Sequence, residues 1–228
     1  MKLRASEISR QFLRKRGDSN VWNAVEKTDF ELEPGKITVL SGNSGSGKST
    51  LLNILAGLLT PTTGRVFYDD TDIYTLDDTS LSRLRNRQIG LVPQIRSALS
   101  SLTVMENVLL PAVLYDDGPK PGREEAKALL ERFGIADLSE VMPSELSGGE
   151  LRRTAIARAL IMRPPVILAD EPTGDLDDSN TDNVLEAFRE AADAGAAVLL
   201  VTHDRDAAKH GDFHYRMNAG HLIREDNP

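Results

Sequence analysis

The sequence lacks cysteine, an excess of basic residues and any long apolar run. Without cysteine, the chain can form no disulfide, no thiolate nucleophile and no cysteine-ligated metal site. Lys and Arg total 27 against 35 Asp and Glu, giving a net charge of −8. This balance argues against a general nucleic-acid-binding protein, which would have a basic face. The most apolar run is residues 194–201, far short of the roughly 20 residues that cross a bilayer.

The first seven residues contain no apolar segment of the kind that a signal peptide requires. The remaining composition is ordinary, with 40% hydrophobic and 27% charged residues, which is typical of a soluble globular protein. A chain of 228 residues is long enough to bury a core without disulfides. We therefore expect an acidic, soluble, intracellular protein with no membrane anchor of its own.

The order of apolar and polar stretches predicts an α/β fold. Residues 37–40, 166–169 and 198–201 are short apolar runs typical of buried strands, and residues 49–56 and 182–194 have helical patterns. Strands that are apolar throughout and alternate with helices indicate a mainly parallel sheet covered on both faces.

Other segments are assigned from local signals. We predict β structure over residues 3–36, a strand at 65–68, and mainly helices over 79–162, including a helix at 126–133. A cluster of Asp, Gly and Pro predicts a loop at 116–122.

A glycine-rich loop lies between the first apolar strand and the helix that follows it. Its sequence, Gly42-Asn-Ser-Gly-Ser-Gly-Lys48-Ser49, matches G-x-x-x-x-G-K-[S/T]. Glycines let backbone N–H groups curve around an anion, and the helix start adds partial positive charge. We expect Lys48 to reach the β- and γ-phosphates and the Ser49 hydroxyl to ligate Mg²⁺. A plain small-residue turn is the alternative, but the flanking strand and helix favour nucleotide binding.

Two carboxylates, Asp170 and Glu171, follow the second apolar strand, at the sheet edge where ligands bind in open α/β folds. Asp170 can hold Mg²⁺ beside Ser49, generally through a water molecule. Glu171 should face another direction, because successive strand residues alternate, and can act as general base toward an attacking water. A solvated strand end would be the simpler explanation without the phosphate loop.

His203 follows the third apolar strand and could donate a hydrogen bond to the γ-phosphate or to the attacking water. A lone histidine after a strand is more often merely exposed or capping. His210 and His214 have a helical spacing that suggests a metal site. Because Gly211 and Asp212 interrupt any helix there, we do not expect zinc.

A second glycine motif, Leu146-Ser-Gly-Gly-Glu150, opens another predicted helix. Ser147 and Glu150 have the spacing of a capping box. Capping alone does not require the two adjacent glycines, Gly148 and Gly149, whose exposed N–H groups at a helix start form a second anion-binding site.

Together these motifs resemble the ATP-binding-cassette (ABC) ATPases over nearly the whole chain. Six features occur in the family's order and approximate spacing: the phosphate loop at 42–49, Gln94 in Gly-Leu-Val-Pro-Gln, the signature Leu-Ser-Gly-Gly at 146–149, Asp170-Glu171, Leu176-Asp177 and His203. The finer pattern, in the segments that begin at Ser44, Leu102, Ile156 and Ala169, is similar to the macrolide-exporter and lipoprotein-releasing branch.

The resemblance implies a P-loop NTPase fold: a RecA-like, mostly parallel sheet, an N-terminal antiparallel β subdomain and an inserted α-helical subdomain. Residues 1–228 would form one ATPase domain. About residues 1–94 and 163–228 would form the core with its β subdomain, and about 95–162 the helical subdomain containing the signature.

The resemblance also implies that two copies pair head to tail and enclose two ATP molecules with Mg²⁺. The signature of one copy would clasp the γ-phosphate held by the other copy's phosphate loop, and Asp177 would couple the two sites. The residues implied to bind ATP are Phe12, Gly42, Asn43, Ser44, Gly45, Ser46, Gly47, Lys48, Ser49, Thr50, Gln94, Ser147, Gly148, Gly149 and Asp177. The implied metal ligands are Ser49, Gln94 and Asp170, and the implied catalytic residues are Glu171 and His203.

An aromatic residue near the N-terminus stacks on adenine in this family. Phe12 fits best, because Ala24 and Val25 match the stretch that follows it, and Trp22 is the other candidate. An ordinary packing role is the alternative for either ring.

The signature segment departs from the family pattern. Glu150 stands where Gln is usual, and Leu151, Arg152 and Arg153 differ from the common Gln-Arg sequence. Glu150 preserves the capping box and suits the helix dipole, but it brings a negative charge near a triphosphate.

By resemblance, the surface around residues 95–114 would receive a short cytoplasmic helix of integral membrane permease subunits. The chain would be peripheral on the cytoplasmic face of the cell membrane and would drive export or extraction of a peptide, lipoprotein or hydrophobic compound. One alternative is a cassette that regulates a membrane process without transport. Another is a soluble cassette acting on nucleic acid or ribosomes. Soluble cassettes of that kind usually carry two cassettes in one chain or a long coiled-coil insertion, and this sequence has neither. We therefore expect no nucleic-acid partner.

Overall fold

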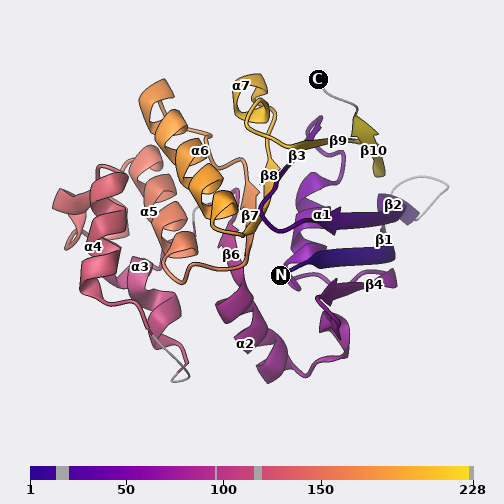
Figure 1. The fold of residues 1–228 in the computed structure, drawn as a ribbon, viewed down its shortest axis with the longest axis horizontal. Coiled ribbons are helices and arrows are strands. Elements are labelled where there is room, and N and C mark those ends of the chain that lie inside the picture. The colour runs from indigo at the N-terminus through magenta and orange to yellow at the C-terminus, as the bar shows by residue number, and fades with distance from the viewer. Residues whose placement is uncertain (14–20, 96, 116–119, 226–228) are drawn as a thin grey trace.

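The computed structural model describes residues 1–13, 21–95, 97–115 and 120–225. Its strands form two sheets, and its helices surround the larger one (Figure 1). The smaller sheet is antiparallel, in the order β2-β1-β4-β5. Its strands are β1 (Leu3–Leu13), β2 (Val21–Leu32), β4 (Thr63–Tyr68) and β5 (Thr71–Asp72). This arrangement agrees with the β structure expected near the N-terminus.

The larger sheet has the order β10-β9-β3-β8-β7-β6. Its members are β3 (Ile37–Gly42), β6 (Ile89–Val92), β7 (Val166–Asp170), β8 (Ala197–Val201), β9 (Phe213–Asn218) and β10 (His221–Glu225). All neighbours pair in parallel except β9 and β10. The three apolar runs predicted as strands are thus adjacent in one sheet.

Strands β7 and β8 are buried along their whole length because both sheet faces are covered. Alternate residues belong to different cores, as the two-residue period of a strand requires. Ile167 and Val198 pack into a core with the helices α3 to α6, while Leu168 and Leu199 pack into a core with α1 and the smaller sheet. Helix α1 therefore lies between the two sheets (Figure 1).

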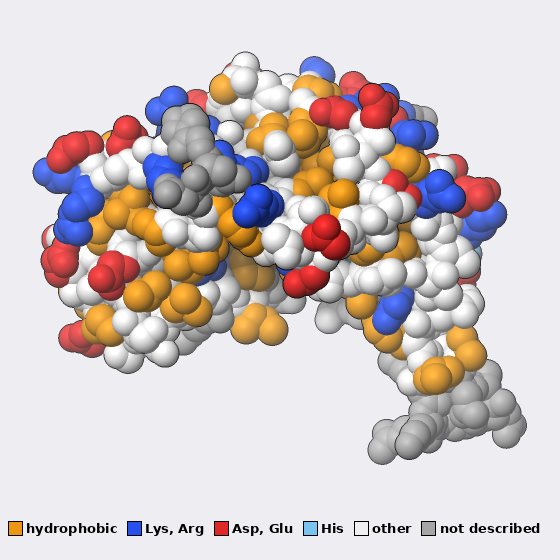
Figure 2. All heavy atoms as spheres, turned by 90° about the horizontal axis from the view of Figure 1, so that it is seen from below, with side chains coloured by type: hydrophobic (Ala, Val, Ile, Leu, Met, Phe, Trp, Pro, Cys, Tyr) orange, Lys and Arg blue, Asp and Glu red, His pale blue; other side chains and the backbone are white. Residues whose placement is uncertain are grey.

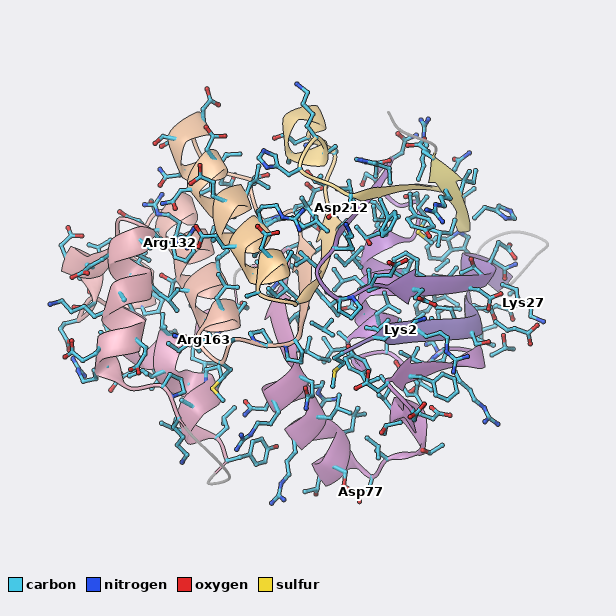
Figure 3. All side chains as sticks on the ribbon, in the orientation of Figure 1. Lys2, Lys27, Asp77, Arg132, Arg163 and Asp212 are labelled. Atoms are coloured by element: carbon cyan, nitrogen blue, oxygen red, sulfur yellow. The ribbon has the colours of Figure 1, made fainter. Side chains whose placement is uncertain are left out.

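The helices begin and end at the expected kinds of residue. Asp177 caps α6 by accepting a hydrogen bond from the Asn180 N–H at 2.9 Å, and Asp77, labelled in Figure 3, caps α2 in the same way. Gly134 follows the end of α4 in the left-handed region at φ 64°. The helices are α1 (Lys48–Leu55), α2 (Asp78–Gln88), α3 (Val104–Val113), α4 (Arg123–Arg132), α5 (Gly148–Leu160), α6 (Asp178–Asp193) and α7 (Arg205–Ala208).

Helices α3, α4 and α5 lie together at one end of the molecule, away from the smaller sheet (Figure 1). An ion pair between Arg132 and Glu190 joins this group to α6. No helix in the described part of the chain is long and apolar enough to cross a membrane.

One expectation from the sequence was wrong in part. The region expected to be mainly helical contains β6, a four-residue strand that pairs in parallel with β7 directly after α2 ends. The interruption expected between His210 and His214 is confirmed, because His210 lies in a turn after α7 and His214 lies in β9. Of the loop expected at 116–122, residues 116–119 lie outside the described residues.

Candidate active site

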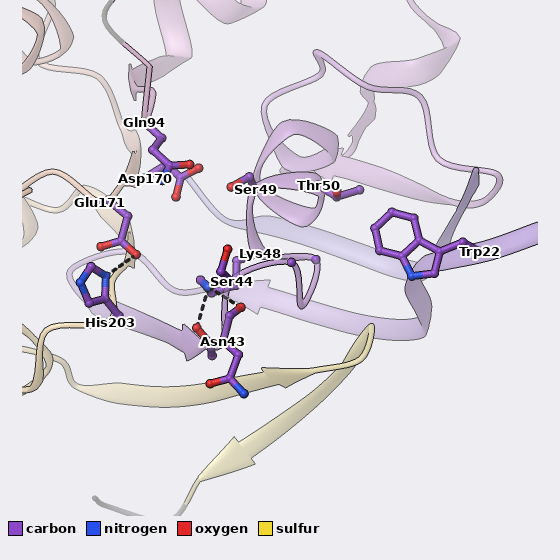
Figure 4. A pocket seen from close by; sticks show the side chains of 13 residues that line it. Trp22, Asn43, Ser44, Lys48, Ser49, Thr50, Gln94, Asp170, Glu171 and His203 are labelled. Atoms are coloured by element: carbon purple, nitrogen blue, oxygen red, sulfur yellow. Dashed lines mark hydrogen bonds and ion pairs between the residues drawn. The ribbon is translucent and has the colours of Figure 1, made fainter. Parts of the chain in front are cut away.

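A cavity of about 540 Å³ opens where β3, β7 and β8 end (Figure 4). It lies at the carboxyl ends of the parallel strands, the edge at which α/β sheets bind ligands. The lining residues are Trp22, Gly42, Asn43, Ser44, Gly45, Gly47, Lys48, Ser49, Thr50, Gln94, Asp170, Glu171 and His203. Most of the residues predicted for one nucleotide site are therefore together.

The phosphate loop curves from the end of β3 to the start of α1 through glycines with positive φ. A Cβ on Gly47 would lie 2.0 Å from the Ala24 carbonyl oxygen, and one on Gly42 would lie 2.3 Å from that of Met217, so neither position admits a side chain. A Cβ on Gly45 would instead meet no protein atom within 4 Å. The loop thus packs against the protein on one side and leaves open space on the other, as a phosphate cradle requires.

Lys48 folds back over this loop. Its ammonium donates hydrogen bonds to the carbonyl oxygens of Gly42, at 2.6 Å, and Asn43, at 3.1 Å. The charge is held at the cavity, close to where phosphate oxygens would lie. Ser46 is buried and is not one of the cavity's lining residues, although it belongs to the same loop.

Three side chains with oxygen atoms that can ligate a metal, Ser49, Gln94 and Asp170, come from three different segments and line the same cavity. Asp170 ends β7, is only 5% exposed, and lines the cavity together with Ser49. Burial is the main reason that its pKa is raised, and a nearby cation would favour the ionised carboxylate. The Gln94 side chain lines the same cavity as Asp170 (Figure 4). A hydroxyl, a carboxylate and an amide oxygen suit Mg²⁺, so these residues fit the metal that the sequence implies.

Glu171 lies one residue beyond β7 and has a left-handed backbone, with φ 50°. Its N–H donates to the Val201 carbonyl at 2.8 Å, which fixes this unusual conformation against β8. The carboxylate is 14% exposed and lies 2.9 Å from His203 Nδ1. Both side chains line the cavity, so a carboxylate and an imidazole face the space beyond the phosphate loop (Figure 4).

The structure places Trp22, and not Phe12, on the cavity wall. The two residues are directly opposite each other in the β1–β2 pair, and their rings stack with centroids 6.0 Å apart. The Arg10 guanidinium lies 4.7 Å from the Phe12 ring centroid. Both rings lie on the same face of the sheet, and it is β2, whose Ala24 packs against Gly47 of the phosphate loop, that brings its ring to the cavity.

The signature forms a second, separate cavity at the start of α5. It is lined by Ser147, Gly148, Gly149, Arg153, Asp175, Leu176, Asp177 and Asn180, none of which lines the first cavity. The predicted capping box is confirmed, since the Glu150 carboxylate accepts from both the N–H and the hydroxyl of Ser147 at 2.7 Å. These bonds lower the pKa of Glu150.

Arg153 and Asn180 also line the signature cavity; the sequence had marked Arg153 only as a departure from the family pattern and had not singled out Asn180. Each had a local signal. Arg153 follows Glu150 by three residues and therefore shares its helix face. Asn180 follows Asp177 by three residues, the spacing of a helix cap, and its amide binds both carboxylate oxygens of Asp177.

The fold and the phosphate loop define a P-loop ATPase, with a second glycine-lined cavity at the signature. The sequence profile of the ABC transporter family matches residues 25–174. The lipoprotein-releasing system ATP-binding protein LolD of Treponema denticola is 41% identical over 86% of this chain and 88% of its own. LolD of Gluconobacter oxydans is also 41% identical, over 97% and 95%.

Solved structures agree with these sequence matches. The dimeric ATP-binding cassette MJ0796, in a post-hydrolysis state bound to ADP and Pi, has a TM-score of 0.90 and 31% identity, covering 99% of this chain and all of that one. The chain belongs to the ABC transporter family, as one of its ATP-hydrolysing, nucleotide-binding subunits. This confirms the resemblance to the family and to its lipoprotein-releasing branch.

Proposed function

We propose that the chain works as a head-to-tail pair and hydrolyses ATP between two copies. One observation carries this proposal: the phosphate-loop cavity and the signature cavity of one chain share no lining residue. A second copy can bring its signature, Ser147 to Gly149, to the phosphate loop of the first. The dimeric state of the similar cassette MJ0796 supports this arrangement.

We assign the roles within each site as follows. Trp22 stacks on adenine, and the phosphate loop with Lys48 binds the phosphates. Ser49, Gln94 and Asp170 hold Mg²⁺, with Asp170 acting through a water molecule. When bound, Mg²⁺ neutralises charge on the phosphates.

Hydrolysis requires a water molecule to be activated beside the γ-phosphate. Glu171 is suited to accept its proton, because its carboxylate faces the cavity next to the phosphate loop. His203, which contacts that carboxylate at 2.9 Å, holds the γ-phosphate. Asp177, beside the signature glycines, couples the paired sites.

We further propose that the pair drives integral membrane permease subunits and is peripheral on the cytoplasmic face of the membrane. Helices α3 to α5 would form a helical subdomain that receives the permease. Exposed hydrophobic side chains support this surface: Ile95 and Leu99 precede α3, and Val113 and Leu114 lie at its end. Hydrophobic side chains gather over this end of the face in Figure 2. The named relatives favour lipoprotein extraction as the task.

The paired site is tested by trapping the dimer. Glu171→Gln protein should bind ATP with Mg²⁺ without hydrolysing it and should elute as a dimer in size-exclusion chromatography. Adding Gly149→Asp, which places a negative charge at the signature, should return it to a monomer that still binds ATP. An unchanged dimer with both substitutions would contradict the head-to-tail arrangement. Thermal melting checks that each variant is folded.

The membrane partner is tested by purifying the chain from detergent-solubilised native membranes. An integral membrane protein with four spans and large domains outside the cytoplasm should accompany it if the lipoprotein-releasing assignment is right. Recovery with ribosomes or DNA alone would overturn the transport role. A partner that is a membrane enzyme, with no transport activity, would favour regulation.

A further inference from the structure

The loop that carries Gln94 has no regular structure among its described residues, although it follows directly after β6. Two arginines of α5 bind it. Arg152 Nη1 donates to the Pro93 carbonyl at 2.7 Å, and Nη2 donates to the Gln94 carbonyl at 2.9 Å. Arg158 donates to the carbonyl of Ser97 at 2.9 Å and to its hydroxyl at 2.5 Å. Helix α5 therefore holds this loop from one side.

Arg152 contacts the backbone on both sides of the Gln94 Cα. The guanidinium is planar, and its two terminal nitrogens form a rigid fork. The two carbonyls that it binds belong to the peptide groups immediately before and after the Gln94 Cα. Fixing both peptide planes limits the backbone rotation at that Cα, and hence the direction of the side chain. That side chain lines the same cavity as Asp170 (Figure 4).

We propose that Arg152 is a positioning residue that holds Gln94 in the orientation required for binding Mg²⁺. The proposal rests on the metal-ligand role suggested above for Gln94. It also ties the metal site to the signature. Arg152 and Gly148, the first residue of α5, lie in one continuous helix, about 6 Å apart along its axis.

Metal binding can be measured apart from turnover with Mn²⁺ as the probe, since the carboxylate and amide oxygens that suit Mg²⁺ also suit Mn²⁺. In a Glu171→Gln background with ATP bound, the electron paramagnetic resonance signal of free Mn²⁺ reports the affinity of the site, with ATP alone as the reference. Adding Arg152→Gln should weaken Mn²⁺ binding about 10- to 100-fold, as loss of a ligand's supporting partner typically does. ATP affinity in EDTA should be unchanged, because the phosphate loop is untouched.

Arg152→Lys separates geometry from charge. Lysine keeps the positive charge but has no fork for two consecutive carbonyls. It should therefore weaken Mn²⁺ binding nearly as much as Arg152→Gln, and full rescue by lysine would overturn the proposal. Arg123→Gln is the matched control, since Arg123 lies on α4 and pairs with the exposed Glu140. It should leave Mn²⁺ binding unchanged.

A double-mutant cycle tests whether Arg152 acts through Gln94. If it does, Arg152→Gln should have little further effect on Mn²⁺ binding in a Gln94→Ala background. Full additivity of the two effects would show that Arg152 acts independently of Gln94. If Gln94→Ala alone leaves Mn²⁺ affinity unchanged, the proposed metal role of Gln94 fails. If only Arg152→Gln is without effect, the metal role stands and the positioning role falls.

Discussion

Replacing Trp22 with alanine should weaken ATP binding, whereas the same change at Phe12 should not. The two rings lie directly opposite each other at the cavity end of the β1–β2 pair, but only Trp22 lines the cavity. If adenine stacks on the indole, the loss falls on nucleotide affinity. Removing the Phe12 ring takes away a side chain whose ring centroid lies 6.0 Å from that of Trp22, but it leaves in place the indole that would contact adenine.

The size of the effect follows from stacking energies and from the exposure of Trp22. Truncating an aromatic ring under a base costs about 1–3 kcal/mol. Trp22 is part-exposed, so its face is only partly shielded from water, and the lower half of that range applies. A loss of about 1–2 kcal/mol corresponds to roughly a 5- to 30-fold increase in the Kd for ATP. Trp22→Phe keeps a stacking face and should retain most of the affinity.

Isothermal titration calorimetry with ATP and Mg²⁺ measures the Kd of each variant. The wild-type protein offers an independent check, because Trp22 is the chain's single tryptophan and its emission reports that residue alone. Emission should change when ATP binds. If Phe12→Ala raises the Kd for ATP as much as Trp22→Ala does, or if Trp22 emission does not change when ATP binds, adenine does not stack on Trp22. Thermal melts of both alanine variants separate lost affinity from lost folding.

Three further substitutions test other parts of the molecule. Glu171→Gln should lower phosphate release by about 10²- to 10⁴-fold while ATP still binds; normal turnover would place the general base elsewhere. Glu150→Gln should not lower ATPase activity, since an amide oxygen can still accept from the Ser147 N–H, and a severe loss would reveal another role for the carboxylate. Gly90→Ala should reduce the free energy of unfolding by about 1–3 kcal/mol, because overpacking is costly. Its Cβ would lie 2.4 Å from the Ala159 carbonyl oxygen, and an unchanged urea midpoint would contradict this packing.

The sequence predicted those parts of the candidate site in which the ligand-binding residues and the residues that set the backbone conformation are contiguous in the chain. The phosphate loop needs glycines, a lysine and a helix start in immediate succession, and the structure shows that order curving around one cavity. Strands β7 and β8 could also be predicted from the sequence, because a strand buried on both faces is apolar along most of its length. In such segments local pattern and final environment agree.

The errors arise where a distant segment decides the outcome. Ile89 to Val92 follow α2 without a break and contain Gly90, so nothing local marks them as a strand. They become β6 by pairing with β7, residues more than seventy positions later in the chain. The choice between Phe12 and Trp22 likewise depends on which of the two paired strands lies beside the phosphate loop, and that strand is β2.

The conformation of the loop that carries Gln94 also depends on a distant segment. Gln94 was found by its resemblance to a family motif, but its backbone is held by Arg152, 58 residues later. The sequence marked that arginine only as a departure from the usual pattern. Arg152 lies on α5, whose first residue is Gly148, so one helix carries both the signature glycines and the side chain that binds the Gln94 backbone. A substitution that removes the contact between Arg152 and the Gln94 backbone should weaken metal binding and leave the affinity for metal-free ATP unchanged. No single motif in the chain would predict this result.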